Sequence, residues 1–155
     1  MKTVLCVFLF LVTWVPLTWV PAWAALGQTE DSVQADARAL NGNTNTRAMS
    51  GYTIHQVTKP DGSVLREFVS PQGLVFGVAW QGPTMPNLPL LLGSSFSDFQ
   101  EGSKNDTTRG VRHRGPLSIR QNHLVLQTGG HLRAFHLRAY LANLLPKGVS
   151  EEVVQ

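Results

Sequence analysis

The stretch YTIHQVTKPDGSVLREFVSPQGLVFGVAW, residues 52–80, decides the fold. Polar and apolar residues alternate along its first two segments, which is the period of a β-strand. Pro60-Asp61-Gly62 and Ser70-Pro71-Gln72-Gly73 separate the segments and have the composition of tight turns. The last segment, Leu74–Trp80, is almost continuously apolar, as expected of a central strand buried on both faces, with Trp80 in the core. The stretch therefore predicts three antiparallel strands joined in a meander.

A second group of strands is expected nearer the C-terminus. Apolar residues at a period of two lie on both sides of Gln121-Asn122, which predicts a hairpin. Gln127–Gly130 is expected to turn once more and to lead into a last strand over His131–Tyr140. An amphipathic helix over Ala134–Leu145 remains an alternative for this segment, so residues 140–146 are expected as either loop or helix.

Two helices complete the predicted fold. Thr29–Leu40 has early carboxylates and apolar residues at helical spacing, and residues 86–99 carry a leucine and phenylalanine stripe of two to three turns. The polar stretches 41–51 and 100–115 are expected to be flexible loops. Together these elements predict a single α+β domain over residues 25–155, with an antiparallel meander sheet, a short N-terminal helix and one covering helix between two groups of strands.

The N-terminus predicts export from the cytoplasm. Lys2, a long apolar run and the small residues Ala22 and Ala24 form the three parts of a signal peptide over residues 1–24, with cleavage between Ala24 and Ala25. Since the apolar run is longer than usual, an uncleaved membrane anchor is the alternative. After cleavage no membrane span is expected. Cys6 is the only cysteine and lies in this segment, so the processed chain is expected to lack disulfides and thiolate metal ligands.

Positive charge is concentrated in the C-terminal half. Residues 104–147 hold eight of the thirteen basic residues and one acidic residue. This half predicts binding of an anionic envelope polymer, lipid head groups or an acidic protein, and nucleic acid is not expected for an exported chain. The candidate anion-binding residues are Arg109, Arg112, His113 and Arg114. A solvated basic face without a ligand is the alternative.

A pentad occurs twice near the C-terminus, as HLRAF and HLRAY from His131 to Tyr140. On one strand, an odd separation would put His131 and His136 on opposite faces, so the pair is not expected to hold a metal. No motif identifies catalytic, cofactor-binding or metal-binding residues. The main hypothesis is a non-enzymatic binding or structural module. A hydrolase would require His55, His123 or His131 to meet carboxylates in a pocket. Assembly through an open sheet edge is a third possibility.

Three segments carry a resemblance to a known family. Arg66–Val69, Val75–Trp80 with Gly82-Pro83, and Gly129–Phe135 resemble the bacterial family catalogued as domain of unknown function 2844. The likeness spans most of the chain after the N-terminal apolar segment. It implies an exported, periplasmic or secreted protein of a Gram-negative bacterium. The family has no established activity, so the resemblance implies no catalytic or binding residue.

Overall fold

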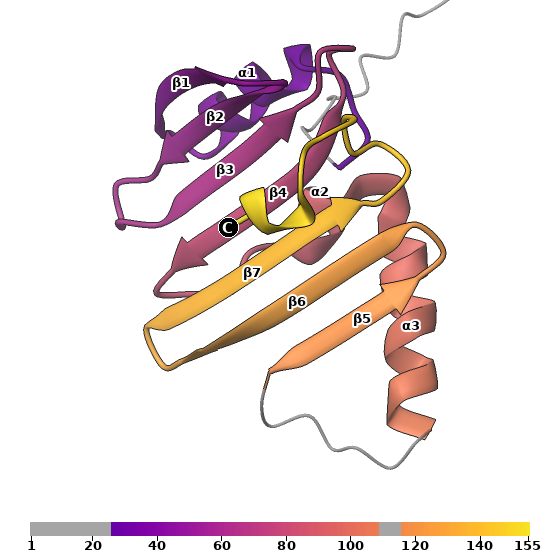
Figure 1. Ribbon diagram of the computed structural model, residues 1–155. Coiled ribbons are helices and arrows are strands. Elements are labelled where there is room, and N and C mark those ends of the chain that lie inside the picture. The colour runs from indigo at the N-terminus through magenta and orange to yellow at the C-terminus, as the bar shows by residue number, and fades with distance from the viewer. Residues whose placement is uncertain (1–25, 109–115) are drawn as a thin grey trace, which may run out of the picture.

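The computed structural model describes residues 26–108 and 116–155, which form one sheet with its α-helices packed on one face (Figure 1). In chain order the elements are α1 (Asp31–Ala39), β1 (Asn43–Met49), β2 (Tyr52–Thr58), β3 (Val64–Val69), β4 (Val75–Gly82), α2 (Leu88–Leu92), the 3-10 helix η1 (Gly93–Ser95), α3 (Phe96–Thr108), β5 (Leu117–Gln121), β6 (Leu124–His131), β7 (Ala134–Leu141) and the 3-10 helix η2 (Glu151–Val153). The predicted α+β class with an antiparallel sheet is confirmed.

The seven strands pair in the order β1-β2-β3-β4-β7-β6-β5, and every pair is antiparallel. The two predicted groups of strands are the two halves of this sheet, joined where β4 pairs with β7. After β4 the chain passes through the helices to the far edge at β5 and returns strand by strand. Residues from both halves of the sequence therefore lie side by side at the centre of the sheet.

The first meander forms as residues 52–80 predict. At its two turns the Lys59 N–H donates to the Ser63 carbonyl over 2.8 Å, and the Ser70 N–H donates to the Leu74 carbonyl over 2.9 Å. Every residue from Val75 to Trp80 is buried, which confirms the expectation for the central strand. Trp80 is 5 % exposed and lies in the core.

The two faces of the sheet have different covers, and each encloses an apolar cluster. On one face, here called the helix face, the main core includes Val57, Leu65, Trp80, Leu124 and Leu126 packed against Val33 of α1 and Leu91 and Leu92 of α2. On the other, here called the tail face, the C-terminal segment lies across the sheet (Figure 1). There it covers a smaller core of Phe68, Phe76, Ala79, Val125, Tyr140 and Val154.

Gly77 lets the C-terminal segment approach the tail face closely. A Cβ atom at this position of β4 would lie 2.8 Å from Cγ2 of Val154, inside van der Waals contact. Val154 is fully buried in this arrangement. Since apolar burial contributes about 25 cal/mol per Å², even this short segment adds to the stability of the fold.

Residues 41–51, expected as a loop, contain strand β1. All seven residues of β1 are exposed, and its sequence NTNTRAM has no apolar alternation that could have revealed a strand. The hairpin with β2 is set instead by the two-residue loop Ser50-Gly51, in which Gly51 has φ of 86°. The expectation failed because turn geometry and cross-strand pairing, rather than hydrophobic burial, define this strand.

The helical region also differs from the expectation. One covering helix was expected within residues 86–99, whereas the chain forms α2, then η1 from Gly93, then α3. Because α3 continues to Thr108, residues 100–108 are helical and do not belong to a flexible loop. Contacts with β5 hold this polar helix in place, and such contacts cannot be read from its composition.

The repeated pentads do not form one strand. His131 ends β6, Leu132 and Arg133 form the turn, and the second pentad lies in β7. Arg133 has φ of 67°, a left-handed conformation that hydrophobic patterning does not reveal. The expected turn at Gln127–Gly130 is instead part of β6. By register His131 and His136 belong to the same face, so the prediction of opposite faces was wrong.

Candidate functional site

A row of polar side chains crosses the tail face beside the C-terminal segment. Cross-strand register aligns one residue from each of the seven strands: Asn45, Gln56, Arg66, Ala79, Arg138, Gln127 and Ser118. We call this set the arginine row. Six of its seven members are polar, and two of these carry a guanidinium group.

The two guanidinium groups of the arginine row are held in the same way. The Arg66 Nε–H donates to Gln56 Oε1 over 3.3 Å, and the Arg138 Nε–H donates to Gln127 Oε1 over 2.7 Å. Each bond joins neighbouring strands and orients a planar group that can hold a second acceptor with its terminal nitrogens. Ala79 lies between the two arginines, so their backbones are two strand spacings, about 10 Å, apart.

Arg66 also lines a hollow with a second arginine. The hollow measures about 210 Å³ and is lined by Asn45, Arg47, Ile54, Gln56 and Arg66, from β1, β2 and β3. We call it the Arg47–Arg66 hollow. Its lining combines two guanidinium and two amide groups with no carboxylate. Such a donor set binds phosphate, sulfate or carboxylate oxygens.

The tail face carries both the arginines and acidic groups of the C-terminal segment. His55 forms an ion pair with Glu30, and Lys59 forms one with Asp61. Arg66 Nη1 also donates to the Gln155 backbone oxygen over 3.0 Å, at the border of the C-terminal segment. The tail-face acid Glu151 accepts a hydrogen bond from the Tyr140 hydroxyl. Burial, followed by this bond, raises the pKa of Tyr140, so its hydroxyl stays protonated at neutral pH.

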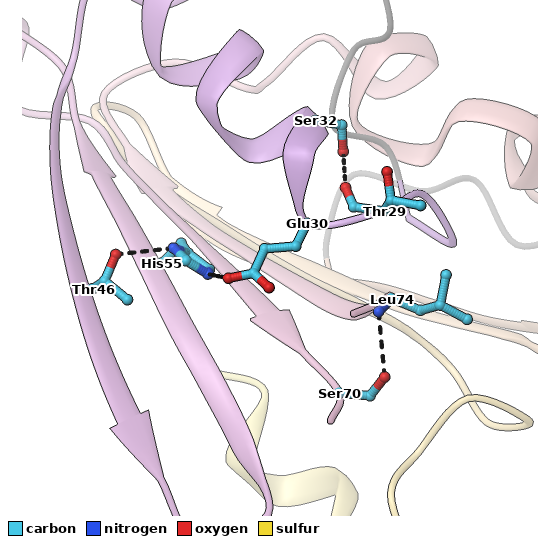
Figure 2. A network of polar contacts seen from close by, with 7 residues as sticks. All are labelled: Thr29, Glu30, Ser32, Thr46, His55, Ser70 and Leu74. Carbon is cyan, nitrogen blue, oxygen red and sulfur yellow. Dashed lines mark hydrogen bonds and ion pairs between the residues drawn. The ribbon is translucent and has the colours of Figure 1, made fainter. Parts of the chain in front are cut away.

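The helix face contains a second polar cluster, shown in Figure 2. Thr46 Oγ1 lies 3.0 Å from His55 Nδ1, and His55 Nε2 lies 2.9 Å from Glu30 Oε1. This chain links the residue before α1 to both strands of the first hairpin. Its order of hydroxyl, imidazole and carboxylate is the order used by hydrolases. None of the three residues lines the Arg47–Arg66 hollow or the cavity beside Trp80.

Glu67 lies directly opposite His55 on the helix face and has no polar partner. Its side chain is fully buried, and neither carboxyl oxygen has a hydrogen-bond partner within the described structure. Burial, and to a smaller extent nearby Asp36, raises the pKa of Glu67 to about 8. Glu67 is therefore protonated and neutral at pH 7, which lowers the cost of placing it in the core.

A cavity of about 190 Å³ lies beside Trp80 on the helix face. Lys59 Nζ stands 5.6 Å from the Trp80 ring centroid, and the indole N–H donates to the Thr84 carbonyl over 2.9 Å. Asp36 and Lys59 both line the cavity among mostly apolar side chains, including Leu40, Leu65, Met85, Leu90 and Leu91. The opposite charges of these two residues leave no clear preference for an anion or a cation.

The residues predicted from sequence fall in several places. Arg109, Arg112, His113 and Arg114 lie outside the described residues, as do Ala24 and Ala25. His123 and His131 are exposed and meet no carboxylate within the described chain, whereas His55 does meet one. Asp98 accepts a hydrogen bond from Asn122 over 2.8 Å, which ties α3 to the β5–β6 turn.

Sequence reasoning missed the Arg47–Arg66 hollow. Both arginines lie in the half of the chain that is not basic overall, so charge counting gave them no weight. Their convergence depends on the pairing of β1 with β2 and of β2 with β3. The available signal for the hollow would have been that Asn45 and Arg47 are alternate residues of one strand.

The fold is a small α+β domain with a polar tail face. A family model for proteins of unknown function, DUF2844, matches residues 22–154. The chain therefore belongs to this family, as the resemblance implied. No curated protein and no solved structure matches the chain at a significant level.

Proposed function

We propose that the protein is an exported, non-enzymatic module that binds an anionic component of the cell envelope through its tail face. The Arg47–Arg66 hollow carries this proposal, because two guanidinium groups and two amides line one concave surface without an acidic residue. The arginine row extends the same chemistry to Arg138 and joins the two halves of the sheet. The proposal thus keeps the expected anionic ligand and assigns its binding to the Arg47–Arg66 hollow and the arginine row in place of Arg109–Arg114.

The ligand chemistry is a phosphate or carboxylate group on a polymer or lipid. Glutamine partners orient Arg66 and Arg138 without neutralising them. Arg66 Nη1 already donates to the Gln155 oxygen, so the other terminal nitrogens of the two side chains are the donors proposed for an outside acceptor. Exposed charges of this kind are screened by salt within about 8–10 Å at physiological ionic strength. Binding should therefore weaken as salt is raised.

A vesicle experiment tests the proposal. Binding is measured by sedimentation with phosphatidylglycerol vesicles, with phosphatidylcholine vesicles and with soluble inorganic polyphosphate, at low and high salt. We expect binding to both anionic probes if the phosphate alone is recognised, and to the anionic vesicles alone if a lipid surface is required. Equal binding to phosphatidylcholine, or binding that salt does not change, would contradict the proposal.

Arginine variants on the two faces of the sheet locate the site, and the single variants R47Q, R66Q and R38Q each remove one positive charge. R47Q/R66Q removes both guanidinium groups of the hollow and should weaken binding about tenfold or more, because a hydrogen bond to a charged group contributes about 1.5 kcal/mol or more. R38Q removes an exposed arginine from α1, on the other face, and should leave binding nearly unchanged. Equal losses in R38Q and in either single variant, R47Q or R66Q, would show that only the overall charge matters.

Export to the periplasm is part of the proposal and rests on the N-terminal sequence. Lys2, the apolar run and Ala22-Trp23-Ala24 support removal of residues 1–24. Expression in a Gram-negative host followed by osmotic shock should release a chain whose first residue is Ala25. A cytoplasmic chain that begins at Met1 would contradict export.

A hydrolase is the second candidate function, and the Thr46–His55–Glu30 chain is the observation that favours it. In such an enzyme His55 would take the proton of the Thr46 hydroxyl while Glu30 holds the imidazole. Chromogenic esters of varied acyl length provide the test. Turnover that H55A abolishes would favour this function, and turnover equal in wild type and H55A would reject it.

A further inference from the structure

Strand β1 is an unprotected edge of the sheet. It is seven residues long, pairs with β2 without a register shift, and contains no proline. Arg47 is its one charged residue, and all seven residues are exposed. Proteins usually protect such edges with short strands, bulges, prolines, charged side chains or a covering helix. Of these features, β1 has a single charged side chain, Arg47.

The opposite edge is protected. β5 has five residues, carries the exposed Arg120, and packs against α3. A helix packed beside a short edge strand hinders the approach of another strand. The two edges of the sheet therefore differ, and within the described residues β1 is the longer and less protected edge.

Hairpin geometry shows which backbone groups of β1 are free. The two-residue loop makes Met49 and Tyr52 the closing hydrogen-bonded pair, and such pairs then alternate along the hairpin. Thr46 and His55 consequently form a non-hydrogen-bonded pair. The N–H and C=O groups of Thr44, Thr46 and Ala48 point away from β2 and form a regular row of donors and acceptors at the edge.

We propose that β1 pairs antiparallel with β1 of a second copy of this chain, which extends the sheet across a two-fold axis. The register centred on Thr46 pairs all seven residues of each strand, placing Thr46 opposite its symmetry mate and Thr44 opposite Ala48 of the other copy. Every outward donor then meets an acceptor. No like charges lie directly opposite one another, because Arg47 faces Asn45 of the other copy.

The side chains of β1 favour a second copy over an apolar peptide. Asn43, Thr44, Asn45 and Thr46 are polar and offer no pocket for apolar anchors, whereas cross-strand threonine and asparagine pairs stabilise a polar sheet. Because strand pairing alone buries a small area, the dimer should be weak and concentration-dependent. Pairing would also bring Arg47 and the Arg47–Arg66 hollow of both copies to one continuous surface, although the dimer does not depend on anion binding.

Sedimentation of the processed chain, as isolated from cells, tests the proposal with variants that place like or opposite charges across the β1–β1 pair. Wild type should dimerise as concentration rises. T44K/A48K places lysine opposite lysine at two symmetric positions and should raise the dissociation constant about tenfold or more. T44K/A48E places lysine opposite glutamate and should restore dimerisation to the wild-type level or above. Urea unfolding should show that both variants fold as wild type does.

Four results would overturn the proposal. A wild-type chain that stays monomeric at all attainable concentrations would exclude the dimer. A dimer that persists unchanged in T44K/A48K would place the interface elsewhere. Loss of the dimer in both double variants would exclude the register centred on Thr46. Dimerisation that appears only with a polyanion would show that the ligand, rather than β1, joins the copies.

Discussion

Arg66 and Glu67 are neighbours in β3, and the two faces of the sheet accommodate their charges in opposite ways. Glu67 points to the helix face, where it is fully buried without a partner and is neutral at pH 7 because its pKa is about 8. Arg66 points to the tail face, where it is half-buried, bonded to Gln56 and still charged. The helix face therefore holds Glu67 in its neutral form, whereas the tail face holds Arg66 in its charged form.

The comparison shows that net charge understates the positive character of this surface. The formal charge of +3 counts Glu67 as an anion, although burial keeps it protonated. Meanwhile Arg66 and Arg138 have amide partners in place of carboxylates. Arg47, Arg66 and Arg138 thus place three guanidinium groups on one face of a sheet whose chain has a modest overall charge.

The largest expected effect concerns the protonation of Glu67. Its pKa is raised from 4.5 to about 8 in the folded chain, so the associated stability is present below pH 4.5 and is lost as pH rises through 8. The loss should be on the order of 5 kcal/mol at most. E67Q should remove this dependence, as measured by urea unfolding at pH 5, 7 and 9. Equal pH dependence in wild type and E67Q would show that Glu67 ionises normally.

Phe68→Ala tests whether the tail face has a core of its own. Phe68 is 1 % exposed and packs near Tyr52 and Phe76, with ring centroids 6.3 and 6.2 Å away. Its truncation should destabilise the fold by about 3–5 kcal/mol, as measured by urea unfolding. Val153→Ala, at a partly buried position of the same cluster, is the milder control. A cost below about 1 kcal/mol for Phe68→Ala would show that the helix face alone holds the domain together.

A smaller effect is expected where the C-terminal segment is attached. Tyr140→Phe removes the hydroxyl that donates to Glu151 and should cost about 1 kcal/mol. Glu151 begins η2, and the amide of Val154 donates to the Glu151 carbonyl. Once the Tyr140 contact is lost, this amide should therefore exchange faster with solvent. Hydrogen exchange followed by NMR measures this change. An unchanged rate at Val154 would mean that apolar contacts alone hold the segment.

The smallest stability effects belong to the arginines. R66Q and R138Q should each change the free energy of unfolding by about 0.5 kcal/mol or less, since both positions are partly solvated. Binding of polyphosphate should nevertheless weaken in both. Urea unfolding and a binding titration on the same samples separate the two effects. A loss of stability as large as that of Phe68→Ala would assign these arginines a structural role.

The sequence predicts the parts of this fold that burial defines. Residues 52–80 alternate or are continuously apolar because β2, β3 and β4 lie between covered faces, and their turns carry the proline and glycine that these conformations favour. The alternation also places Leu65 and Glu67 on one face and Arg66 and Phe68 on the other, as the register confirms. It gives no sign that Glu67 lacks a partner.

What the sequence does not predict depends on register and on tertiary contacts. β1 has no apolar period, and the turn at Leu132-Arg133 depends on one residue with positive φ, so both were missed. The Arg47–Arg66 hollow requires three strands in register and could not be assembled from local patterns. The anion site expected at Arg109–Arg114 lies outside the described residues and stays a prediction.

Arginine side-chain NMR tests the central claim most directly. The Nε–Hε signals of Arg47, Arg66 and Arg138 can be followed together with that of Arg38 as inorganic polyphosphate is added. We predict that the three tail-face signals shift and saturate, that the shift diminishes at high salt, and that Arg38 on α1 does not respond. Equal shifts at all four arginines, or none at Arg47 and Arg66, would contradict a cationic binding site on the tail face.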